Sequence, residues 1–236
     1  MLKIKVLFLR NTTHGYRQGV KIGLLLLLLS GVQLIQLSPL AAQETVSQFF
    51  TRAETAHQKI QDYKALWRMN INEQNSVATA YYKTPGNVLL KYNTPSKRFI
   101  LITNTQLVIY NHQNKILMTQ PLEGAQAGPP SLRVMRRLYS MRYKYPTGSQ
   151  PVKEEGIGSP VIVLLLNPIN SSARIEELQV SFYPTSLLMR QVKGSWYGSK
   201  VEYNFLDIQT NIGLEDTIFD PKNPPGAKEW AKFLQD

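Results

Sequence analysis

The 236-residue sequence contains no cysteine. This absence excludes disulfide bonds, thiolate zinc sites, cysteine nucleophiles and the lipid-bearing cysteine of a lipoprotein. Histidine is scarce, with three in the chain, and neither an HExxH nor a GxSxG motif is present. Gly156 and Gly158 lack the third glycine of a dinucleotide fingerprint. We therefore expect no enzyme, no bound metal and no cofactor, and we expect His57 and His112 to be solvated.

Acidic residues are missing from residues 1–43, which carry five basic ones. The whole chain has 27 Lys and Arg against 16 Asp and Glu, a net charge of +11, which suggests nucleic acid or an anionic surface as a partner. Without residues 1–43, 22 basic and 16 acidic residues remain, a net charge of +6. Nearly half of the excess charge therefore lies in a segment that need not belong to the folded protein.

The same segment has the parts of a secretory signal peptide. Its basic residues precede a short apolar run at Ile22–Leu29, and small residues follow at 38–43. The uninterrupted run is about eight residues long, whereas a membrane span needs roughly twenty. We predict a signal peptide at 1–43 and a single exported domain at 44–236. An uncleaved membrane anchor is the alternative.

The exported part begins with an amphipathic helix and then changes its period. Apolar residues recur at three- and four-residue steps over 44–64, and alternation with period two begins at Ala65. Turn-forming Pro, Gly, Asn and Ser residues separate the strands that we predict at 65–71, 78–83, 87–92, 98–103, 106–110, 115–119, 160–166, 177–183, 187–193 and 200–206. We predict further helices at 132–141 and around 227–234. The pattern favours a mainly β fold with α-helices, in which a curved antiparallel half-barrel sheet has helices over its open side.

Apolar residues gather on single faces of these strands. A well-packed core would explain them, but a curved sheet has a face too broad for two short helices to fill, and such a face can hold an acyl chain at about 0.8 kcal/mol per buried CH₂. Assignment to one face depends on register, because a slip of one residue reverses it. The candidate cavity residues are Phe49, Trp67, Met69, Leu89, Phe99, Leu101, Leu107, Ile109, Val163, Leu165, Val180, Phe182, Met189, Val201, Tyr203 and Phe205.

Basic residues cluster in and after the predicted middle helix, at Arg133, Arg136, Arg137, Arg142 and Lys144. They suit contact with an acidic partner or an anionic membrane surface, and equally the solvated face of a helix. We take Arg133, Arg136 and Arg137 as the candidate contact residues. Nucleic acid is disfavoured, because an exported protein seldom meets it.

The order of the short motifs resembles one family. A hairpin with Lys83, Pro85 and Tyr92 is followed by further strands, and the chain closes on Asn-x-x-Leu at 211–214, Phe-Asp-Pro at 219–221 and Pro-Pro-Gly at 224–226. In this order and spacing the sequence resembles the LolA family of periplasmic outer-membrane lipoprotein carriers. The resemblance covers essentially the whole of the chain after the predicted signal peptide.

This resemblance implies a half-barrel of about eleven antiparallel strands, with helices as a lid over an apolar cavity. It implies a periplasmic monomer without a cofactor. Acylated lipoproteins would be its cargo, taken from an inner-membrane ABC transporter and given to an outer-membrane acceptor. One departure concerns the arginine that often ties the lid shut in this family, since Thr84 stands there, beside Lys83. A periplasmic sensor or regulator of the same fold, and an exported hydrolase with an unrecognised site, are the alternatives.

Overall fold

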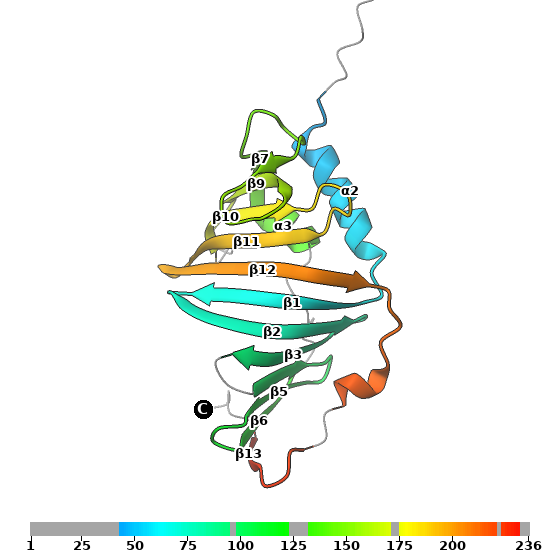
Figure 1. The fold of residues 1–236 in the computed structure, drawn as a ribbon, viewed down its shortest axis with the longest axis vertical. Coiled ribbons are helices and arrows are strands. Elements are labelled where there is room, and N and C mark those ends of the chain that lie inside the picture. Colours follow the sequence, from blue (N-terminus) through cyan, green and yellow to red (C-terminus); the bar gives the residue numbers. More distant parts are fainter. Residues whose placement is uncertain (1–42, 95–97, 123–131, 171–174, 221–222, 232–236) are drawn as a thin grey trace, which may run out of the picture. The chain divides into compact units, whose positions relative to one another are not determined.

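The structure is a computed structural model that describes residues 43–94, 98–122, 132–170, 175–220 and 223–231 (Figure 1). All of them belong to one compact unit, Gln43–Asp236. The predicted signal peptide thus lies outside the described residues, apart from Gln43. Within the described ranges, no helix has the length and apolarity needed to cross a membrane.

One curved, open sheet of thirteen strands forms the body of this unit, which confirms the predicted mainly β half-barrel class (Figure 1). The order is β13-β6-β5-β4-β3-β2-β1-β12-β11-β10-β9-β7, with β8 paired to β9. The pairing is antiparallel except between β13 and β6, which are parallel. The strands are β1 (Asp62–Ile71), β2 (Gln74–Lys83), β3 (Asn87–Thr94), β4 (Arg98–Ile102), β5 (Gln106–Asn111), β6 (Ile116–Pro121), β7 (Tyr139–Tyr143), β8 (Val152–Lys153), β9 (Pro160–Pro168), β10 (Ile175–Phe182), β11 (Met189–Trp196), β12 (Ser199–Thr210) and β13 (Lys228–Ala231).

Two predicted helices differ in the structure. The middle one, α3 (Leu132–Leu138), stops early, and Tyr139–Tyr143 continues as β7 because it pairs with β9. The tail forms β13 instead of a helix over its described part, since its backbone bonds to the exposed edge of β6. In both places a partner strand outweighs local helix propensity. These two strands and the short β8 account for the three that the sequence prediction lacks.

The first helix, α2 (Val46–Gln58), begins at a complete capping box. The Thr45 hydroxyl accepts the Gln48 backbone N–H at 3.3 Å, and the Gln48 side chain accepts the Thr45 backbone N–H at 2.9 Å, so two free donors at the helix start are satisfied. The helix ends earlier than predicted, because β1 already begins at Asp62.

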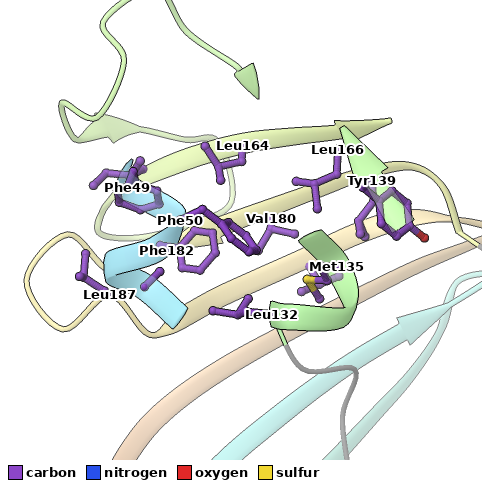
Figure 2. Close-up of a cluster of buried hydrophobic side chains, with 14 residues drawn as sticks. Phe49, Phe50, Leu132, Met135, Tyr139, Leu164, Leu166, Val180, Phe182 and Leu187 are labelled. Atoms are coloured by element: carbon purple, nitrogen blue, oxygen red, sulfur yellow. The ribbon is translucent and has the colours of Figure 1, made fainter. Parts of the chain in front are cut away.

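The two faces of the sheet carry separate cores. On the face that carries α2 and α3, here the helix face, Phe49 and Phe50 of α2 pack against Phe182 of β10, with ring centroids 5.4 and 6.4 Å apart. Figure 2 shows these rings with Leu132 and Met135 of α3 over β9 and β10. This core lies over β7 and β9 to β12, which we call the helix-covered half.

On the opposite face, residues 211–220 form a strap that includes the 3-10 helix η1 (Asp216–Phe219). Phe219 and Ile218 pack there against Leu89, Leu101 and other apolar residues of β3 to β6, so we call β2 to β6 the strap-covered half. A third, smaller cluster joins Val161 and Val163 of β9 to the neighbourhood of β8.

Asp62 anchors the strap. The residue is 5% exposed, and its carboxylate accepts hydrogen bonds from the backbone N–H groups of Ile212, Gly213 and Leu214 at 2.7, 3.1 and 3.2 Å. Lys83 donates to the Leu214 carbonyl at 2.7 Å and pairs with an Asp216 oxygen at 2.7 Å. The Asn-x-x-Leu motif is thus the backbone cradle of a buried carboxylate. Lys83 holds the strap, on the face away from the helices.

Candidate apolar binding site

A pocket of about 80 Å³ lies where the end of α2 meets β1, β12 and the connection from β10 to β11. Except for one histidine, its lining is aliphatic or aromatic. The lining residues are His57, Ile60, Tyr63, Ala65, Trp67, Leu188, Met189, Phe205 and Ile208. Such a site suits hydrocarbon, and its polar side-chain groups are the His57 imidazole, the Tyr63 hydroxyl and the Trp67 indole N–H.

Register brings three predicted residues to this pocket. Trp67 of β1 stands directly opposite Phe205 of β12, with ring centroids 5.1 Å apart and the rings at 78°, and Met189 closes the same space from β11. The next pair along the two strands is Met69 opposite Tyr203, which lies on the same face. Val201, one pair further, is buried on this face.

Three other predicted residues belong to the packed core of the helix face. Phe49, Val180 and Phe182 are each 0% exposed and occupy the space between α2 and the sheet. They fill volume in this structure, so a chain could reach them only if α2 moved. Tyr203 and Phe205 pack against the edge of this core, which makes the pocket and the core continuous.

Leu107 and Ile109 of β5 also lie on the helix face, in the strap-covered half. Ile109 stands opposite Ile100 of β4, which stands opposite Leu90 of β3, and all three are half-buried. Directly paired residues share a face, so they form an apolar row with Met118 of β6. Sequence reasoning missed Leu90, Ile100 and Met118, although the same alternation marks them.

Five predicted cavity residues face the other way, which corrects their grouping with Trp67 and Phe205. Leu89 pairs with Leu101 and lies with Phe99 under the strap, and Leu89 and Leu101 are 1% and 0% exposed. Val163 and Leu165 alternate with the core residues of β9 and face away from the helices. The physical reason is the two-residue period of a strand, which puts neighbours on opposite faces, while both faces of this sheet are apolar.

The prediction that His57 is solvated is wrong, whereas His112 is exposed as predicted. The Nε2 atom of His57 is buried and has no hydrogen-bond partner among the described residues. Burial lowers the pKa of His57, and a hydrogen bond with the Leu187 backbone opposes part of that shift. The imidazole is therefore neutral at pH 7. Its position at the end of an apolar helix face gave no sequence signal.

The three candidate contact arginines divide into two kinds. Arg133 and Arg137 of α3 are exposed. Arg136 is engaged with α2, because its guanidinium contacts Glu54 at 3.4 Å and Thr51 at 2.8 Å and lies 5.5 Å from the centre of the Phe50 ring. It therefore ties one helix to the other.

The described part of the chain holds no group of three or more His, Asp or Glu side chains placed to bind a metal ion.

The sequence profile described as outer membrane lipoprotein carrier protein LolA matches residues 68–222. Because this match covers more than half of the chain, the protein belongs to the LolA family. Its curved sheet is the lipoprotein-binding fold of that superfamily. No curated protein matches the chain by sequence.

Solved structures share the fold at low sequence identity. An uncharacterized conserved protein from Thermus thermophilus superposes with a TM-score of 0.55 at 10% identity, over 78% of this chain and 98% of that one. MucB superposes with a TM-score of 0.50 at 11% identity, over 75% of this chain and 62% of MucB. At such identities the likeness concerns the fold alone.

Proposed function

We propose that this protein is a periplasmic carrier that binds the acyl chains of lipoproteins and takes them from the inner to the outer membrane. One observation carries the proposal: an apolar pocket opens between α2 and the sheet, at the edge of the helix-face core. Hydrocarbon bound there gains about 0.8 kcal/mol per buried CH₂. Family membership agrees with this cargo class.

Loading requires α2 to move. The pocket of about 80 Å³ is smaller than the range typical of ligand sites, about 300–1,000 Å³. If α2 swings away, Phe49 and Phe50 leave the sheet and an acyl chain takes their place beside Phe182. One apolar contact replaces another, which keeps affinity moderate and permits delivery.

Arg136 is the proposed latch of this lid. Thr84 stands where the family often has its lid arginine, and Lys83 beside it holds the strap on the opposite face. Arg136 instead joins α3 to Thr51 and Glu54 of α2. The Arg136 side chain is exposed and Glu54 is partly covered, so this ion pair contributes little stability, about 1 kcal/mol, which suits a contact that must open.

Arg133 and Arg137 are the proposed partner contacts. Both are exposed on α3, next to the lid. Their charge suits an acidic surface on an inner-membrane ABC transporter, on an outer-membrane acceptor, or on anionic lipid headgroups. Because α3 also carries the latch residue Arg136, binding of a partner at Arg133 and Arg137 would couple to the opening of α2.

A release assay tests the carrier function. Inner-membrane vesicles with an acylated lipoprotein, the transporter and ATP are incubated with the purified protein, and lipoprotein is measured in the supernatant after sedimentation. We expect ATP-dependent release, lost in Phe205→Glu because a charge then enters the pocket. Gln209→Glu, which adds the same charge at an exposed position of β12, is the matched control. No release by the unaltered protein contradicts the carrier function.

The second candidate is a periplasmic regulator that binds lipid or protein and controls a membrane partner. The observation that favours it is the fold likeness to MucB, which has been solved in a Pseudomonas aeruginosa MucA/MucB complex. This candidate predicts stable binding to one membrane protein and no transfer of lipoprotein. The same release assay, with acceptor vesicles added, therefore separates the two.

A further inference from the structure

His57 is a polar group that the apolar pocket does not satisfy. Its Nε2 is buried without a hydrogen-bond partner among the described residues, although buried polar atoms are normally paired. The other polar side-chain groups of the lining are the Tyr63 hydroxyl and the Trp67 indole N–H, and Nε2 makes no hydrogen bond with either. Because His57 lines the pocket, its unpaired ring nitrogen is a point where a ligand can bind when α2 moves.

The neutral imidazole of His57 can act as a hydrogen-bond acceptor. Burial lowers the pKa of His57, which favours the uncharged ring. In a neutral imidazole one nitrogen donates and the other accepts. With the proton on Nδ1, Nε2 carries a lone pair and takes a hydrogen-bond donor as its partner.

The backbone around Leu187 is held in an unfavourable conformation. Its φ is +59°, in the left-handed region that a leucine avoids, and the turn is fixed by hydrogen bonds from Leu187 N–H to Tyr183 O and from Tyr183 N–H to Leu188 O, each 2.9 Å. Strained residues of this kind concentrate at ligand sites. Leu187 directly precedes Leu188, which lines the pocket together with His57.

We propose that His57 Nε2 accepts a hydrogen bond from the amide N–H or hydroxyl that adjoins an acyl chain, while the chain itself lies against Trp67 and Phe205. The inference rests on the proposed acyl-binding function and adds the chemical class of the head group. The partner is a neutral donor, because the pocket holds no charged side chain that would stabilise an ion. A simple ester or an ionised fatty acid lacks the donor and binds less well.

Two probes with equal chains test the donor requirement. N-methyldodecanamide carries an amide N–H, and N,N-dimethyldodecanamide lacks it. Both are titrated into the full-length protein and followed by calorimetry. We expect the N–H probe to bind about 3- to 10-fold more tightly, the ratio that one hydrogen bond supplies. In His57→Leu the ratio falls to about one, because the acceptor is gone.

Two further variants exclude a general disturbance of the pocket. Tyr63→Phe removes the other side-chain acceptor of the lining, the Tyr63 hydroxyl, and the preference for the N–H probe is expected to persist. His57→Gln restores an acceptor of similar reach, so part of the preference returns. Equal binding of both probes by the unaltered protein, or an unchanged ratio in His57→Leu, overturns the role of His57 alone. If neither probe binds, the proposed acyl-binding function is overturned as well.

Discussion

The helix-covered half and the strap-covered half of this sheet bury opposite faces. In the first, Leu164 and Val180 point toward α2 and α3, and in the second, Leu101 and Tyr110 point toward the strap. The strands of both halves show the same alternation, so the covering element decides which face becomes core. The difference leaves the helix face of the strap-covered half with apolar side chains that belong to neither core, such as Ile100 and Ile109.

The strongest test of this comparison is Leu101→Ala against Ile109→Ala, on neighbouring strands and opposite faces. Leu101 is 0% exposed within the strap-face core, so its truncation is expected to lower the free energy of unfolding by about 2–5 kcal/mol. Ile109 is half-buried, and its truncation is expected to cost about 1 kcal/mol or less. Urea denaturation measures both. Equal losses would mean that the two faces of this half are packed alike.

The strap itself is tested at its anchor. Asp62→Ala leaves three backbone N–H groups of the strap without their acceptor, and about 1–3 kcal/mol of stability is expected to be lost. The control is Asp216→Asn, which removes only the exposed partner of Lys83 and is expected to have a small effect. Thermal unfolding monitored by circular dichroism compares them. If the Asp62 anchor contributed no stability, the two variants would unfold at the same temperature.

Binding of a dodecyl chain tests which face of the sheet holds the ligand site. Trp67→Ala, in the pocket of the helix face, is expected to weaken binding about tenfold, because one aromatic wall is lost. Phe99→Ala, on the strap face of β4, is expected to leave the affinity of the folded protein unchanged. Titration calorimetry on both variants, after a check of folding, gives the values. A loss in Phe99→Ala would place the site on the strap face.

The smallest expected effect is the pH dependence of folding stability that arises from His57 in the pocket. Burial lowers the folded-state pKa of His57 below the value of about 6.5 that it has in the unfolded chain. Below that pH the unfolded state binds more protons, so stability is full above about 6.5 and declines as the pH falls toward the folded-state pKa. Among the lining residues, the other titratable group is Tyr63 on β1, whose pKa burial raises. Unfolding curves from pH 7.5 to pH 5 should show a decline that His57→Leu reduces; an identical decline in both proteins would assign it elsewhere.

The class of fold follows from the sequence because it depends on features that are local. Turn residues and two-residue alternation mark the strands from Asn87 to Thr119 without knowledge of their partners. The additional strands β7 and β13, by contrast, depend on partner strands that lie elsewhere in the sequence. Tyr139–Tyr143 and Lys228–Ala231 become strands because an open edge is available to each, and no window of sequence contains that edge.

The site was predictable only in part, for a related reason. Trp67, Met189 and Phe205 are large apolar residues on strand faces, and composition and period suffice to select them. The face of Leu89 and Leu101 depends on where the strap lies, and the strap is contributed by residues far along the chain. His57 could not be recognised, because its burial results from Leu187 and the β10–β11 connection approaching the end of α2.

The central pairing of the sheet has a consequence for how the chain folds. β1 pairs with β12, so Ile71 lies opposite Val201, and the backbone of Asn211 bonds to Asp62. The hairpins on either side can form from neighbouring segments, but the seam between them closes only when the last third of the chain is present. Contacts between such distant residues slow folding. During synthesis from the amino end, β1 therefore has an unpaired edge until β12 has been made. In that interval the edge is open to pairing with a strand of another chain, which leads to aggregation.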